Sequence, residues 1–148
     1  MTGGKYGWLL GFVMGVGAIS AVATAGYAMS DYRWKNRPFV VFAPDQTDDR
    51  LAMQKRLVAQ GKTGFVERDM VVILVSGDRQ EALIGEGPGE SADVLRQRFG
   101  VPPGAFRSIL VGKDGGVKLS SGKPITAAEL FSLIDQMPMR LQEMRTRP

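Results

Sequence analysis

Three aspartates lie close together in the segment Pro44-Asp45-Gln46-Thr47-Asp48-Asp49, which directly follows an apolar run. Clustered carboxylates can bind hard cations such as Ca²⁺ or Mg²⁺, or a basic group on a partner. The same residues have a simpler interpretation, because Asp is a favoured helix N-cap and acidic side chains in a first turn complement the helix dipole. We expect capping. The alternative is a metal-dependent enzyme or metal-binding protein that uses Asp45, Asp48 and Asp49.

The residue types that carry much of side-chain catalysis are missing, because the chain contains no Cys and no His. Without Cys, the chain itself cannot perform disulfide exchange or thiol peroxidase chemistry. Without His, it lacks the commonest general base and cannot form a Ser-His-Asp triad. We therefore assign no catalytic residue, no metal ligand set and no cofactor.

The composition is that of one globular domain. The chain has 148 residues, of which 44% are hydrophobic and 23% charged, and this leaves little room for a second domain. Its formal net charge is +4, with acidic and basic residues interspersed. No basic run is long enough to predict a nucleic-acid partner.

The N-terminal segment is an apolar leader. Residues 7–29 carry no charge and follow Lys5, and the small residues at 23–25 suit signal-peptide cleavage before Gly26, with Met29 a less favoured start. The same stretch is also long enough for an uncleaved anchor helix, which needs about 20 apolar residues. Cleavage predicts a periplasmic or secreted protein; an intact leader predicts a membrane-anchored one, with the domain still outside the cytoplasm.

Apolar runs predict the strands of the folded part. Residues 38–43 and 70–75 are continuously apolar, as is typical of strands buried on both faces. Residues 106–111 and 117–119 form a predicted hairpin around Asp114-Gly115-Gly116, whose residues tolerate positive φ.

Capping residues predict three helices, over residues 49–60, 91–99 and 126–137. Ser91 is a good N-cap, and Thr126 with Glu129 forms a capping box. The residues expected to face the core are Leu51, Ala52, Leu57 and Val58 in the first helix, Val94, Leu95 and Phe99 in the second, and Leu130, Phe131, Leu133, Ile134 and Met137 in the third.

This order of elements predicts an α/β fold, a thioredoxin-like βαβαββα three-layer sandwich with a central mixed sheet, preceded by an apolar leader helix. The expected division is a signal peptide or signal-anchor helix at residues 1–29, a linker at 30–36 and the thioredoxin-like domain at 37–138. A short basic tail, expected to be loosely ordered, covers residues 139–148.

In a thioredoxin-type fold the working site lies where the first strand meets the first helix, often beside a proline that precedes the hairpin. We expect trans peptide bonds before both prolines of this chain that precede the hairpin, because only about 5–6% of X–Pro bonds are cis. The predicted binding edge consists of Pro44, Asp45, Gln46, Asp48, Asp49, Pro102 and Pro103.

A second surface feature is possible where the leader meets the domain, at Arg33, Trp34, Lys35 and Arg37. Tryptophan in such a place more often covers the end of a small core. We therefore expect Trp34 to be packed against the domain.

Four segments carry a resemblance to a known family: YRWKNRPFVVFAP, ERDMVVILVSGD, FGVPPGAFRSILVGKDGGVKL and ITAAELFSLIDQMPMR. Over about residues 32–145 the chain resembles a family of small exported bacterial proteins of unknown function. That family has a thioredoxin- or peroxiredoxin-like domain, which also occurs in a vertebrate extracellular-matrix protein with coiled coils. The resemblance implies fold and export, and it brings no catalytic residues.

The sequence thus predicts a non-catalytic, exported thioredoxin-fold domain that binds an extracytoplasmic protein or a small ligand. It predicts no nucleic-acid partner, and contact with a membrane only through an uncleaved N-terminal segment.

Overall fold

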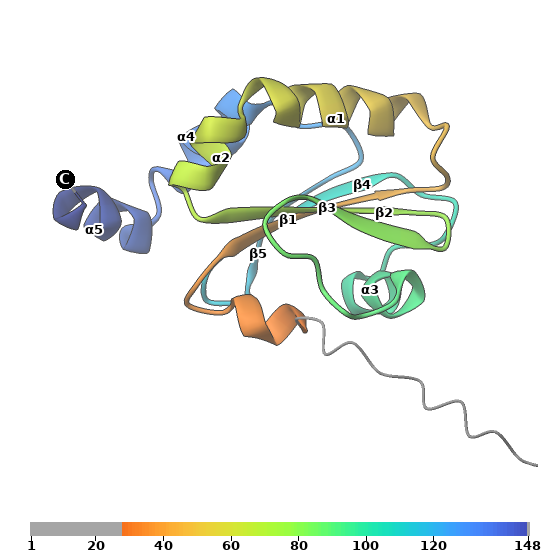
Figure 1. The fold of residues 1–148 in the computed structure, drawn as a ribbon, viewed down its shortest axis with the longest axis horizontal. Helices are drawn as coiled ribbons and strands as arrows, with labels where there is room; N and C mark the ends of the chain where they lie inside the picture. The colour runs from red at the N-terminus through yellow and green to blue at the C-terminus, as the bar shows by residue number, and fades with distance from the viewer. Residues whose placement is uncertain (1–27, 148) are drawn as a thin grey trace, which may run out of the picture.

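A five-stranded mixed sheet forms the centre of the molecule (Figure 1). The computed structural model describes residues 28–147, so the predicted leader lies outside the described residues except for its last two. The strands are β1 (Arg37–Ala43), β2 (Met70–Ser76), β3 (Arg79–Ile84), β4 (Arg107–Val111) and β5 (Val117–Ser121). Their order in the sheet is β3-β2-β1-β4-β5. β1 and β2 are parallel, and the other neighbouring pairs are antiparallel.

Helices cover both faces of this sheet, which explains why every residue of β1 and β2 is buried (Figure 1). One face carries α1 (Asp49–Gln60), α2 (Lys62–Glu67) and α4 (Ala127–Ile134). The other carries α3 (Ala92–Phe99) and the short 3₁₀ helix η1 (Met29–Tyr32). Alternate residues of β1 enter the two resulting cores: Phe39 and Val41 join the first, and Val40 and Phe42 join the second.

The predicted caps and turn are confirmed. Ser91 accepts a hydrogen bond from the amide of Val94 at the start of α3, and Thr126 forms the capping box of α4 with Glu129. Gly100 ends α3 with φ +64°, a conformation that glycine adopts at little cost. The β4–β5 hairpin turns through residues 112–116 as expected.

Between residues 37 and 137, two elements were not predicted, β3 and α2. The second strand was predicted to end at residues 76–79 with no partner strand after it. Instead, the chain turns back through Gly77 (φ +58°), and β3 pairs with β2. β3 is an edge strand whose first five residues are exposed or half-buried, so its sequence RQEALI lacks the apolar run that marks a buried strand. α2 begins at Lys62, directly after Gly61, the residue that ends α1.

The inner face of α1 was partly mispredicted. Leu51 and Val58 are buried as expected, but Ala52 is exposed and Leu57 only half-buried. The remaining inner position is Gln54, which is fully buried. In α3, Val94 also points outward, with 44% of its surface exposed.

Both ends of the described chain pack more closely than the sequence suggested. Residues 30–36 were expected to be a linker, yet Tyr32 is buried in the second core, together with Met29 of the same 3₁₀ helix. The expected loose tail forms a helix, α5 (Pro138–Thr146), with Pro138 in its first turn. Proline favours a helix start, because a first-turn N–H has no helical partner anyway. Within residues 28–147, no helix combines the length and apolarity that crossing a bilayer requires.

Candidate functional site

The predicted binding edge begins at the carboxyl end of β1, where Asp45 stabilises a turn and Asp48 caps α1. Asp45 accepts hydrogen bonds from the Thr47 hydroxyl at 2.6 Å and the Thr47 amide at 2.8 Å, and these bonds lower its pKa. Asp48 caps α1 through the Arg50 amide at 2.9 Å. Its ion pair with the Arg50 guanidinium, at 2.6 Å, lowers the pKa of Asp48.

These contacts leave the metal alternative without a ligand set. The part of the chain that the structure describes holds no group of three or more acidic side chains that could bind a metal ion. Asp48 is therefore the cap of α1, and Asp45 stabilises the turn before it.

Pro102 and Pro103 lie in a different hollow. Both follow trans peptide bonds, as expected. They line an open recess of about 480 Å³ together with Asp93, Arg96 and Gln97, and none of residues 44–49 lines it. The link between the two segments is Arg96, whose guanidinium donates to the Ala43 carbonyl at 3.3 Å.

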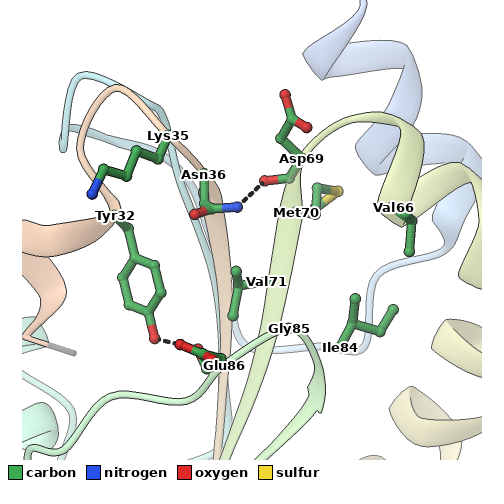
Figure 2. Close-up of a pocket in the computed structure, with 10 residues that line it drawn as sticks. All are labelled: Tyr32, Lys35, Asn36, Val66, Asp69, Met70, Val71, Ile84, Gly85 and Glu86. Atoms are coloured by element: carbon green, nitrogen blue, oxygen red, sulfur yellow. Dashed lines mark hydrogen bonds between the residues drawn. The ribbon is translucent and has the colours of Figure 1, made fainter. Parts of the chain in front are cut away.

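The sequence did not predict the recess in Figure 2, which lies at the amino ends of β1 and β2. We call it the amino-end recess. It has a volume of about 390 Å³ and mixed polar and apolar walls. Its lining residues are Tyr32, Lys35, Asn36, Val66, Asp69, Met70, Val71, Ile84, Gly85 and Glu86.

Two hydrogen bonds fix the walls of the amino-end recess (Figure 2). The Tyr32 hydroxyl donates to the Glu86 carbonyl at 2.6 Å and joins the segment before β1 to the loop after β3. The side-chain Nδ2 of Asn36 donates to the Asp69 carbonyl at 3.3 Å and joins that segment to the start of β2. The recess is thus built from segments far apart in the sequence, so no local pattern could reveal it.

The backbone beside this recess is strained at two positions. Trp34 (φ +66°) and Asp69 (φ +52°) are the non-glycine residues with positive φ among residues 28–147. Such conformations cost about 1–3 kcal/mol each and gather at functional sites. The Trp34 amide donates to the Lys113 carbonyl at 2.7 Å, and the Asp69 carbonyl accepts from the Arg37 amide at 2.9 Å.

The expectation for Trp34 is wrong, because 63% of its surface is exposed and it does not cover the core. The Arg33 guanidinium lies 6.0 Å from its ring centroid. Arg37, which the sequence placed on the same surface, is only 1% exposed. The exposed feature is therefore Arg33, Trp34 and Lys35.

A charged cluster next to the amino-end recess ties α5 to the sheet. Its centre is formed by Arg37, Asp69, Lys113 and Glu143. Burial alone would raise the pKa of Glu143, but hydrogen bonds from Arg37 and Lys113 outweigh burial and lower it. In the same way, Arg147 and Lys113 lower the pKa of Asp69 against the effect of burial.

The fold and these hollows define a mixed α/β domain whose recesses offer hydrogen-bond donors and acceptors beside apolar walls. The chain belongs to the family described as Domain of unknown function (DUF4174), whose model matches residues 28–143. It is 33% identical over 135 residues to coiled-coil domain-containing protein 80 of Danio rerio. That match covers 78% of this chain and 15% of the relative. No solved structure matches the chain.

Proposed function

We propose that this chain is a non-catalytic, exported binding domain with a thioredoxin-like fold. The topology supports the fold assignment, because β1 and β2 are parallel and the antiparallel β4–β5 hairpin continues the sheet beside β1. A helix, α4, follows the hairpin. The edge strand β3, the helices α2 and α5 and the 3₁₀ helix η1 are additions to the expected pattern.

One observation carries the non-catalytic part of the proposal. At the corner where β1 meets α1, a redox member of such a fold would use a thiolate stabilised by the helix N-terminus. Here the corner holds Asp45 and Asp48, whose carboxylates bond the chain's own Thr47 and Arg50. The chain has no Cys that could supply a thiolate and no His that could take its place.

The amino-end recess is the binding surface that the geometry favours. Its apolar lining includes Val66 and Val71, and its polar lining includes Lys35, Asn36 and Glu86. This combination suits a ligand or partner side chain with both apolar and polar parts. The edge predicted from the sequence is the rival surface, since Pro102 and Pro103 line a recess of their own.

Photo-crosslinking tests the proposal and separates the two surfaces. A benzophenone amino acid replaces Lys35 in the amino-end recess, Gln46 on the predicted edge, or Lys123 in the exposed loop after β5 as the matched control. Each protein is irradiated with the extracytoplasmic fraction of its native cells, and adducts are identified by mass spectrometry. We expect one defined adduct from position 35 and none from position 123.

An adduct from position 46 alone would move the binding surface to the predicted edge. Adduct formation at none of the positions would contradict a binding function. Reduction of insulin disulfides or consumption of peroxide by the purified protein would contradict the non-catalytic part.

A further inference from the structure

Two nearly buried cationic side chains contact the same carboxylate, at the end of the sheet where β1 starts. Arg37 is 1% exposed and Lys113 is 7% exposed. Arg37 holds the Glu143 carboxylate with both terminal nitrogens, at 3.2 and 3.1 Å. The Lys113 ammonium lies 2.5 Å from the same carboxylate. This paired geometry is the one in which Arg recognises a planar carboxylate most specifically.

The carboxylate belongs to α5, which attaches to the domain almost entirely through charges. The one buried residue of α5 is Arg140, and it bonds Asp135 and Glu67 at 3.1 Å. The large apolar side chains of the helix remain exposed; these are Met139, Leu141 and Met144. Buried ion pairs gain little net stability, since removing both charges from water offsets their attraction. Leaving one of these charges buried and unpaired is costly, so α5 can be displaced only by a group that brings a carboxylate of its own.

Displacement of α5 would leave the two cations in the domain. Arg37 would keep a carbonyl partner, that of Arg68 at 3.0 Å, and Lys113 would keep Asp69 at 2.8 Å. No carboxylate besides Glu143 is within bonding distance of Arg37 among the described residues. A buried cation without a counter-ion is costly, so the vacated position would favour another carboxylate.

We propose that Arg37 and Lys113 form a carboxylate-binding site that Glu143 occupies in cis, and that an acidic peptide segment of a partner displaces α5 from it. A recess of about 240 Å³ opens beside this pair, lined also by Lys118, Met137 and Met139. Lys118 is paired with Asp114 at 2.8 Å in the same recess, so the attraction for a carboxylate comes from Arg37 and Lys113. The two methionines offer an adaptable apolar wall. These features fit a peptide that carries Glu or Asp beside apolar residues.

This inference rests on the proposed function, because it names a partner class for a binding domain, but it concerns a different surface. The amino-end recess does not include Arg37, Lys113 or Glu143 in its lining. Crosslinking from Lys35 and binding of an acidic peptide can therefore fail independently.

The test measures binding of a fluorescein-labelled peptide of alternating Glu and Ala to the full chain by fluorescence anisotropy at low salt. We expect Glu143→Gln to bind it at least tenfold more tightly than the wild-type chain, because the competing carboxylate is gone. The matched control is Glu81→Gln, which removes the same charge from exposed β3, and we expect it to match the wild type. Adding Arg37→Gln to Glu143→Gln should abolish the gain.

Hydrogen exchange of the wild-type chain gives a readout that does not depend on how well the variants fold. At saturating peptide, amides of α5 should lose protection while those of β1 and β4 keep theirs. Equal affinity of the wild type and Glu143→Gln, or unchanged protection of α5, would overturn the proposal. Displacement of the peptide by inorganic phosphate at a lower concentration than by acetate would overturn the carboxylate assignment in favour of a phosphate group.

Discussion

Gln54 shows how one buried polar side chain can connect distant parts of a small domain. Its amide nitrogen donates to the Ile125 carbonyl at 2.9 Å, and its oxygen accepts from the Ile125 amide at 2.8 Å. The same oxygen accepts from the Ser108 hydroxyl at 3.4 Å. Gln54 thus completes the backbone hydrogen bonds of the segment that leads into α4.

We predict that Gln54→Leu lowers the free energy of unfolding by about 2–4 kcal/mol, because each buried polar group left unsatisfied costs about 1–3 kcal/mol. Urea denaturation followed by circular dichroism measures this loss. The matched control is Gln60→Leu, at an exposed position of the same helix, where a change within about 0.5 kcal/mol is expected. Equal effects of the two substitutions would show that the bonds to Ile125 contribute nothing.

At the scale of elements, α5 differs from the other helices in the kind of contact that attaches it to the domain. α1 and α4 bury apolar residues such as Leu51, Leu130 and Ile134 in the first core. α5 instead contacts the domain through Arg140, Glu143 and the residue after its end, Arg147, which pairs with Asp69 at 2.6 Å. Its docking should therefore depend on pH, unlike that of a helix held by apolar contacts.

The depressed pKa of Glu143 fixes the direction of this pH dependence. A carboxylate whose pKa is lower in the folded state contributes stability that is complete above its unfolded value, here 4.5, and is lost as the pH falls through the folded value. Protonation would leave Arg37, Lys113 and the nearby Arg140 without this counter-charge. Asp69 and Asp135, which also face α5 and also have lowered pKa values, act in the same direction.

We predict that amides of α5 lose protection from hydrogen exchange below about pH 4.5, while amides of α4 keep theirs over the same range. The comparison with Glu143→Gln isolates the contribution of this carboxylate, because the variant should lose less protection on acidification. Protection that falls equally in α4 and α5, or identical pH profiles for the two proteins, would contradict the ionic attachment of α5.

At the scale of the whole molecule, the structure bears on how the leader would be processed. Met29 is buried in the second core, and the Ala28 amide donates to the Asp31 carboxylate at 2.8 Å at the start of η1. Cleavage before Met29 would remove Ala28 and this bond. Cleavage before Gly26 would preserve both.

We therefore predict that the protein recovered from its native cells begins at Gly26, as intact-mass spectrometry would show. A chain beginning at Met29 would indicate that the Ala28 contact is dispensable. A chain that retains residues 1–25 would establish the membrane-anchored alternative. Separation of membrane and soluble fractions before the measurement provides the control, since an anchored form should appear in the membrane fraction.

The sequence by itself determined the elements whose information is local. Strands β1 and β2 are buried on both faces and must therefore be continuously apolar, and the caps of α3 and α4 lie within four residues of the groups they bond. β3 was not predicted, because an edge strand can carry polar residues between its apolar ones and so lacks a continuous apolar run. The buried position of Gln54 was not predicted, because its hydrogen-bond partner Ile125 lies 71 residues away in the sequence.

Only the tertiary structure decided where the recesses and the long-range ion pairs lie. The aspartates at residues 44–49 suggested a site because they are close in sequence, and the same closeness allows Asp45 to bond Thr47 in a turn and Asp48 to cap α1. The amino-end recess and the Arg37–Glu143 pair join segments up to 106 residues apart. Composition and periodicity record which residues are buried, but they do not record which distant side chains meet, because that depends on how the sheet and helices pack.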